Sequence, residues 1–98
     1  MSEQEPRRRI VPSDESEVHD EPHIAGTRVT VRYVHERVEK DGLRPETAAD
    51  RLGIGRAQVY NALAYYHENP DEMRKVEEMR EERIEEARDK AITPADVE

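Results

Sequence analysis

Four residues at the start of one expected helix carry side chains that suit contacts with the base edges of DNA. Arg56, Gln58 and Asn61 follow the segment Gly53-Ile54-Gly55, and Ala57 lies among them. A guanidinium group matches guanine, side-chain amides match adenine, and an alanine methyl can contact a thymine methyl. The spacing therefore indicates base reading from the first turns of a helix in the major groove. The alternative is that these are solvent-facing polar residues of a purely structural helical hairpin.

Other arginines suit contacts with phosphate groups rather than bases. Arg44 and Arg51 lie on or just before the preceding helix, where we expect them to meet the DNA backbone. As lone exposed arginines, they could equally have no role. The run Arg7-Arg8-Arg9 is either a flexible arm that contacts phosphates or, as such runs usually are, a solvated tail.

A helix-turn-helix would position these side chains. Such a motif needs a small residue on its first helix, a turn residue that tolerates positive φ, and apolar residues around the turn. We expect its helices at residues 45–52, opened by a proline, and 56–67. The positions that close the motif are Ala49, Leu52, Gly53, Ile54 and Val59, and the inward residues of the second helix are expected to be Val59, Tyr60, Leu63 and one of Tyr66 or His67.

Upstream of the motif we expect a small β element and one more helix. The alternation from His23 to Val29 around a Gly-Thr turn indicates a strand or short β-hairpin, and residues 9–11 could add a strand. Thr30 can cap a helix from Val31 to Asp41, which Gly42 would end.

The last expected helix runs from Asn69-Pro70 to about residue 91 and is strongly charged. Its narrow apolar stripe is too thin to hold it on a single core. Either it is a solvated helix stabilised by ion pairs, or it packs on a partner protein. The partner-binding candidates are Met73, Val76, Met79 and Ile84.

Composition limits the number of domains, the size of the core and the cellular location that we expect for the chain. Its 98 residues make one domain at most, and a core is expected only from the middle of the chain. Charged residues make up 41% of the sequence, and it contains no cysteine. We divide it into an acidic, arginine-containing and mobile segment 1–20, a strand plus helix-turn-helix domain 21–68, and a charged helix and tail 69–98. So thin a core favours a homodimer. The absence of a secretory or membrane-spanning pattern favours the cytoplasm.

The charge is unevenly distributed. The chain has a net charge of −8, yet residues 24–67 carry seven basic and five acidic side chains, a net of +2. The expected DNA-binding module is therefore the only basic part. The preference for arginine (13) over lysine (3), with 24 acidic residues, is typical of salt-adapted, haloarchaeal-type proteins, although an acidic partner-binding tail would also explain the acids.

Two motifs resemble those of domain-of-unknown-function family 433. The segment Pro22-His23-Ile24-Ala25-Gly26-Thr27-Arg28-Val29-Thr30-Val31 is similar to its P-x-I-x-G-T-R-[IV]-x-V signature, and residues 42–49 match its later G-L-x-P-E-x-x-A spacing. The resemblance, which covers about residues 10–66, implies a winged or strand-decorated helix-turn-helix. It also implies an antitoxin-like role beside a PIN-like ribonuclease toxin.

Within that signature, Gly26, Thr27 and Arg28 are expected to be structural, as is Gly53 in the later turn. Gly26 would supply a turn, and Arg28 would anchor the strand to a carboxylate or a helix end and only secondarily contact DNA. Tyr60, Tyr65 and Tyr66 could stack on bases, but they more often supply a core or a dimer interface.

No cofactor, metal or catalytic site is expected. His19 and His23 are four residues apart but outside any expected helix, and no third ligand lies near them. Taken together, the sequence predicts a mainly helical domain that binds double-stranded DNA as an antitoxin-like or autoregulatory factor and binds a protein partner through its last helix. The alternative is a DNA-independent interaction or oligomerisation module.

Overall fold

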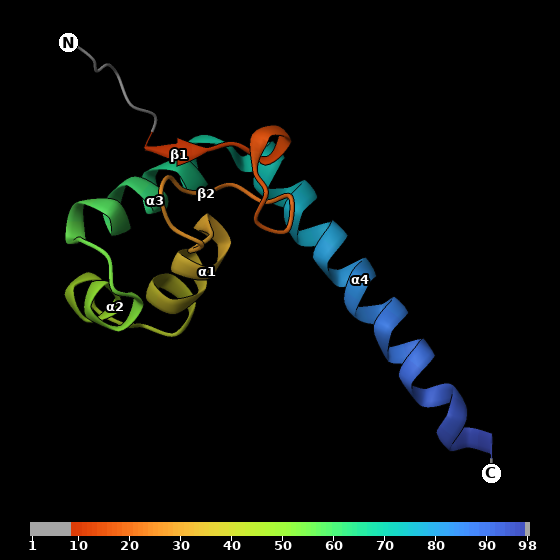
Figure 1. The fold of residues 1–98 in the computed structure, drawn as a ribbon. Helices are drawn as coiled ribbons and strands as arrows, with labels where there is room; N and C mark the ends of the chain where they lie inside the picture. Colours follow the sequence, from red (N-terminus) through yellow and green to blue (C-terminus); the bar gives the residue numbers. More distant parts are fainter. Residues whose placement is uncertain (1–8, 98) are drawn as a thin grey trace.

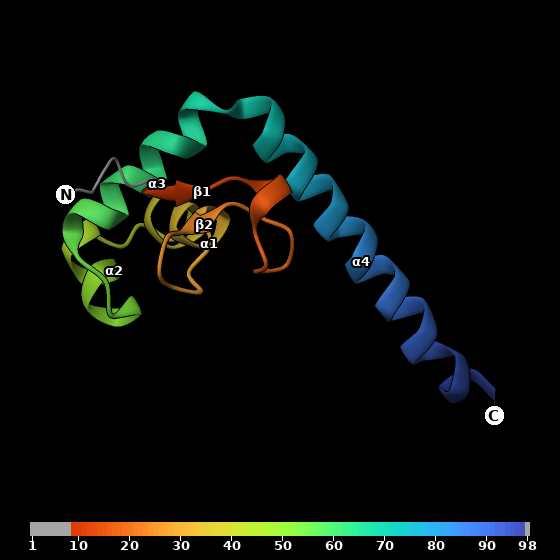
Figure 2. The same cartoon turned by 45° about the horizontal axis from the view of Figure 1, so that its top comes forward.

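The computed structural model describes the backbone of residues 9–97 and the side chains of residues 9–89. A small body is followed by one long helix that projects from it (Figures 1 and 2), giving extents of 63 × 29 × 23 Å. The expected class, mainly helical with a short N-terminal β-hairpin and a long C-terminal helix, is confirmed. The elements are β1 (Ile10–Val11), the 3-10 turn η2 (Ser13–Glu15), β2 (His23–Ile24), α1 (Val31–His35), the π-helix η3 (Glu36–Lys40), α2 (Pro45–Leu52), α3 (Arg56–Glu68) and α4 (Pro70–Val97).

The β element pairs the two strands across a longer connection than the sequence suggested. β1 and β2 are antiparallel, with Ile10 opposite Ile24. The turn that follows β2 adds only an isolated bridge between His23 and Thr30. Gly26 adopts a φ of 80°, so the chain reverses before a second full strand can form.

The segment before residue 21 is more structured than expected. The Ser13 backbone N–H and hydroxyl donate to Oε2 of Glu72 at 2.9 and 2.6 Å, and Val18 is buried. Residues 9–20 therefore pack on the body and do not form an open mobile arm. Arg9 is exposed, while the rest of the arginine run and of the segment 1–8 lies outside the described residues.

The helix after the β element begins where its cap predicts and then changes its pitch. The Thr30 side chain accepts from the backbone N–H of Tyr33 at 3.1 Å, which confirms Thr30 as the N-cap of α1. The expected single helix continues as η3, whose wider turn is closed by Asp41 N–H donating to the Glu36 carbonyl at 2.8 Å. Gly42, with a φ of 80°, ends it as predicted.

The core is small and is made mostly of valine, alanine and isoleucine side chains. Helices α1 and α3 pack together beneath β2, and α4 contributes its first two turns. The buried apolar residues are Val18, Ile24, Val31, Val34, Ala48, Ala49, Val59, Ala62, Met73 and Val76. Leu52 and Ile54 pack partly buried against it, so the residues expected to close the helix-turn-helix do so.

Two expectations about the packing are wrong. Met73 is 1% exposed and Val76 6% exposed, so these two partner-binding candidates belong to the chain's own core. Tyr60, expected to point inward, is 52% exposed. Val59 and Ala62 fill the inward face of α3 instead, because 100° per residue places Tyr60 on the opposite side of the helix.

Candidate nucleic-acid interface

The turn between α2 and α3 presents the start of α3 to solvent. Gly53 ends α2 in the left-handed conformation (φ 71°), and the backbone N–H of Ile54 donates to the Ala49 carbonyl at 3.0 Å. A side chain at position 53 would be strained by this φ value, which is why glycine suits the turn. Gly55 then leads into α3, whose first two residues, Arg56 and Ala57, are exposed.

The four predicted base-reading residues lie on α3, but they are not equally free. Arg56 and Ala57 are exposed, and Nη1 of Arg56 is 4.0 Å from Oε2 of Glu46. Asn61 is half-buried. Gln58 is also half-buried, and its Oε1 accepts from the Gly55 backbone N–H at 2.7 Å. Gln58 therefore caps its own helix, and its amide nitrogen forms no hydrogen bond with the residues that the structure describes and can donate to a base.

The outer face of α3 is distinguished by the absence of charge. Ala57, Tyr60 and Ala64 are exposed there, and Asn61 is half-exposed beside them. This face carries no acidic side chain before Glu68, whereas 24 of the 98 residues in the chain are acidic. Sequence reasoning missed Tyr60 as a member of this face because its bulk suggested a core position in a chain without Phe or Trp.

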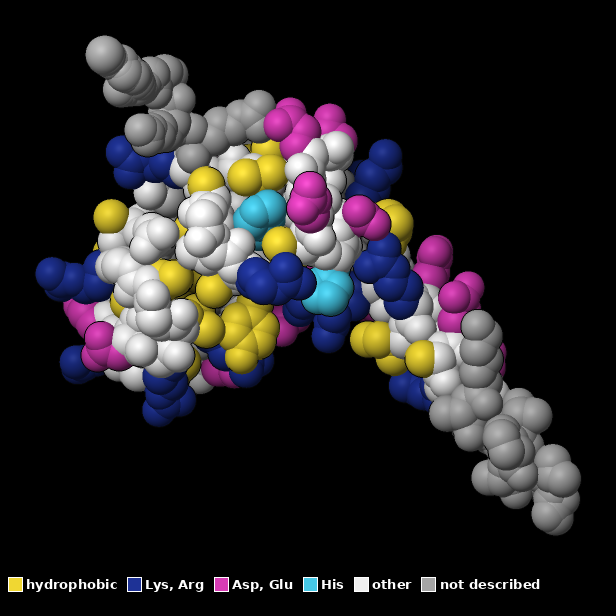
Figure 3. Space-filling view, viewed as in Figure 1, with side chains coloured by type: hydrophobic (Ala, Val, Ile, Leu, Met, Phe, Trp, Pro, Cys, Tyr) yellow, Lys and Arg dark blue, Asp and Glu magenta, His cyan; other side chains and the backbone are white. Residues whose placement is uncertain are grey.

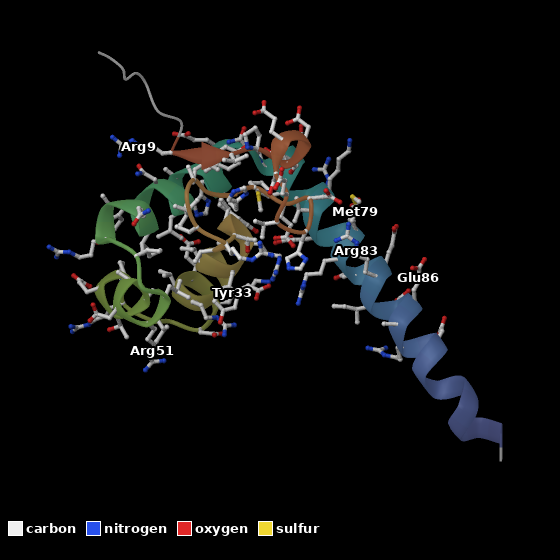
Figure 4. All side chains as sticks on the ribbon, viewed as in Figure 1. Arg9, Tyr33, Arg51, Met79, Arg83 and Glu86 are labelled. Atoms are coloured by element: carbon white, nitrogen blue, oxygen red, sulfur yellow. The ribbon has the colours of Figure 1, made fainter. Side chains whose placement is uncertain are left out.

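The two predicted phosphate contacts lie at opposite ends of α2. Arg44 is the residue that precedes the helix, Arg51 lies in its last turn, and both are exposed. Figure 4 shows Arg51 extending into solvent. Two exposed acids, Glu46 and Asp50, lie on the same helix, so the charge around the motif is close to balanced.

The Pro22–Val31 signature builds the β element and does not line the α3 face. The Thr27 hydroxyl donates to the Ile24 carbonyl at 2.8 Å and accepts from the Val29 N–H at 3.0 Å, and Gly26 supplies the turn. Arg28 is exposed and forms no hydrogen bond or ion pair with the residues that the structure describes. Arg28 therefore does not make the anchoring contact that was expected of it. The turn is held instead by the hydrogen bonds of the Thr27 hydroxyl.

A stacked histidine–tyrosine pair joins α1 to α3. The rings of His35 and Tyr66 are 3.6 Å apart and nearly parallel, and the His67 ring meets them edge-on. Oε1 of Glu39 lies 3.3 Å from Nε2 of His35 and 2.9 Å from Nε2 of His67. Burial lowers the pKa of His35, and the negative charge of Glu39 offsets this lowering only in part.

Packing between α1 and α3 brings the two rings of this pair together. The pKa of Tyr66 is raised to about 12. Burial is the largest cause, and the hydrogen bond that the Tyr66 hydroxyl donates to Glu77 at 2.9 Å is the second. The sequence indicated an inward Tyr66 or His67 but gave no sign of the partner, His35.

Within residues 9–89, no group of three or more His, Cys, Asp or Glu side chains is arranged to hold a metal. The His23 side chain instead places its Nδ1 2.7 Å from the Ser16 hydroxyl.

Polar contacts fix the start of α4 on the body. The Tyr65 hydroxyl donates to Glu72 at 2.5 Å, opposite the Ser13 donors. Burial alone would raise the pKa of Glu72, but the hydrogen bonds from Ser13 and Tyr65 outweigh it and the pKa is lowered. Of the predicted partner-binding residues, only Met79 (48% exposed) and Ile84 (43% exposed) remain on the surface.

Comparisons with known proteins place the chain in a family but assign no activity. No curated protein and no solved structure gives a significant match. Across the described residues, no helix combines the length and apolar character needed to cross a membrane. The sequence profile of a family described as "Protein of unknown function (DUF433)" matches residues 13–66, from η2 to within two residues of the end of α3, and does not include α4. Because this match covers more than half of the chain, the protein belongs to the DUF433 family.

Proposed function

We propose that the chain is a double-stranded DNA-binding protein that reads bases with the outer face of α3. The observation that carries the proposal is the acid-free surface of Ala57, Tyr60, Asn61 and Ala64 in a chain with a net charge of −8. Acidic side chains facing DNA would be repelled by its phosphates, so an exposed helix without them is the surface best suited to enter the major groove.

The flanking arginines support the same docking. Arg56 stands at the start of α3, where recognition helices contact base edges, and its 4.0 Å ion pair with Glu46 is exposed and weak. Arg44 and Arg51 at the ends of α2 suit phosphate contacts. With so few cations, affinity would depend on base contacts and apolar burial more than on bulk charge, as a salt-rich cytoplasm requires.

We propose further that α4 recruits a protein partner, as in an antitoxin-like autoregulator. Its outer face carries exposed acids at helical spacing, Glu78, Glu82, Glu85 and Asp89. Such a face is complementary to the basic nucleic-acid groove of a ribonuclease, including a PIN-like toxin. A homodimer would present two copies of α3 to two half-sites.

The experiment is fluorescence anisotropy of the full chain with DNA from upstream of its own gene, in steps from low to molar KCl. The double variant Arg56→Ala/Asn61→Ala removes base contacts without touching the core. Arg74→Ala on α4, which also removes one positive charge, is the matched control. We expect specific binding over scrambled DNA that the first variant loses and the control keeps. Equal binding to scrambled DNA, or retention by the first variant, would reject the proposal.

The partner role needs a truncation that respects the core. Because Met73, Val76 and Glu77 hold α4 on the body, deletion of residues 81–98 is the appropriate test. It should abolish partner co-purification while DNA binding is retained.

A second function, a DNA-independent oligomerisation module, is favoured by the same α3 face. Tyr60 is 52% exposed in an uncharged setting, which also suits a protein interface. Size-exclusion chromatography with light scattering discriminates the two: Tyr60→Ser should lower the oligomeric state if this face joins copies of the chain.

A further inference from the structure

The inner side of α4 and the body enclose a shallow notch, where Lys and Arg side chains gather as α4 leaves the body (Figure 3). Two hollows of about 260 and 290 Å³ form it, and both are lined by His19 and Arg32, so they adjoin. One reaches along α4 to Ala87 and the other crosses α1 to Leu52. We call the two hollows together the α4 notch.

The α4 notch is basic although the chain is acidic. Arg28, Arg32, Arg80 and Arg83 line it, and the single acidic residue among its described lining is Glu21. Glu21 is buried and its Oε1 lies 3.1 Å from Nε of Arg32, so these two charges compensate each other. Arg32 also pairs with Glu36, and Arg83 pairs with Asp20. Arg28 and Arg80 are therefore the notch arginines left without an acidic partner among the described residues.

Two of those arginines have nothing to bind within the described chain. Arg28 and Arg80 are exposed, and neither forms a hydrogen bond, an ion pair or a ring contact with another described residue. On α4 the exposed acids Glu78, Glu82 and Glu85 occupy the opposite face of the helix, since residues advance by 100°. On the face of α4 that lines the notch, the exposed charged side chains are therefore Arg80 and Arg83.

The loop at the centre of the notch is held in an uncommon conformation. His19 and Asp20 are consecutive non-glycine residues with φ values of 56° and 58°. Arg83 supports the loop from α4, with Nη1 3.4 Å from the His19 carbonyl and Nη2 3.8 Å from Oδ2 of Asp20. His and Asp are among the non-glycine residues that adopt this left-handed region most often, so the contacts from Arg83 fix the loop beside the notch without marked strain.

Apolar side chains lie beside the cations. Ile84 is 43% exposed, and it lines the notch together with Ala87. We propose that the α4 notch binds an acidic amphipathic helix of a protein partner. The partner's carboxylates would pair with Arg28 and Arg80 while its apolar side chains cover Ile84, as in other helix-in-groove interfaces.

A single-stranded nucleic acid fits the notch less well. Such strands need open aromatic faces on which bases stack. The aromatic residue of the notch is Tyr33, and the guanidinium of Arg37 already lies 4.9 Å from the centre of its ring. The apolar side chains on α4 offer contacts to a helix and none to a sugar–phosphate backbone. The proposal concerns a surface other than the outer face of α3 and stands without the DNA-binding proposal.

The test is a display selection of random 16-residue peptides on the full chain, followed by anisotropy with the enriched peptides. We expect enriched sequences with acids and apolar residues at helical spacing. The variant Arg28→Gln/Arg80→Gln, which removes no described contact, should weaken their binding by about five- to tenfold, the value of two exposed ion pairs. The control Arg74→Gln/Lys75→Gln makes the same charge change on the chain but outside the notch, and should bind as the wild type does.

Three results would overturn the proposal. One is that no peptide is enriched, and another is that the enriched peptides lack acids. The third is equal binding to the wild type and to Arg28→Gln/Arg80→Gln. A 20-nucleotide single-stranded DNA is measured in parallel. If the DNA binds, loses affinity in that variant, and no peptide is enriched, the notch is a nucleic-acid site instead.

Discussion

Gln58 should stabilise the fold as well as face DNA, and two substitutions separate these roles. Its Oε1 accepts from the Gly55 N–H at 2.7 Å at the exposed start of α3. In Gln58→Ala that N–H loses its partner in the protein and turns to water. In Gln58→Glu a carboxylate oxygen remains as the acceptor, and its charge is favourable near a helix N-terminus.

The structure sets the size of the expected effects. Loss of an exposed capping hydrogen bond costs about 0.5–1 kcal/mol, of which the better helix propensity of alanine recovers a few tenths at most. For a domain of this size, Gln58→Ala should lower the melting temperature by about 2–6 °C. Gln58→Glu should match or slightly exceed the wild type, because the helix dipole adds about 0.3–1 kcal/mol.

Thermal unfolding followed by circular dichroism measures stability, and anisotropy measures DNA binding. Gln58→Glu should lose DNA affinity through the missing N–H donor and the added negative charge while its stability is intact. Equal stability of Gln58→Ala and wild type would refute the capping role. A Gln58→Glu protein that binds DNA as tightly as the wild type would refute the contact.

Three more predictions concern the packing of α4 and the stacked pair. Met73→Ala should lower the free energy of unfolding in urea by about 2–4 kcal/mol, because this side chain is 1% exposed, whereas Met79→Ala should stay within about 0.5 kcal/mol. Burial lowers the pKa of His35 below 6.5, so the unfolded chain binds the proton more tightly than the folded chain does, and the free energy of unfolding should fall as the pH drops below 6.5. His35→Gln should flatten that part of the stability profile. An unchanged profile would contradict the assignment to His35. In an ultraviolet titration, the tyrosinate absorbance component near pH 12 should disappear in Tyr66→Phe, and its persistence would assign it to another residue.

Local signals were sufficient to predict the elements that bound the candidate site. Thr30 caps α1, Gly42 ends η3, and Gly53 takes the left-handed conformation between α2 and α3, each as the sequence indicated. These residues act through their own backbone or through neighbours three or four residues away. No information about the rest of the fold is needed to place them.

The errors arose where distant parts of the chain decide the outcome. The stripe on α4 was too thin for a free-standing helix, but Met73 has a core to join because Ser13 and Tyr65 bind Glu72 at the same point. The stacking of His35 on Tyr66 joins residues 31 positions apart, and no local periodicity reports such a contact. Tyr60 could not be placed outside until Ala62 was known to fill the inward position.

The most direct measurement of the central claim is an NMR titration of the isotope-labelled full chain with DNA from upstream of its own gene. Backbone amide shifts report every described element in one experiment. We expect the largest changes at Ala57, Tyr60, Asn61 and Ala64, with smaller ones at Arg44 and Arg51. Changes confined to other surfaces, or the same response to scrambled DNA, would contradict the claim.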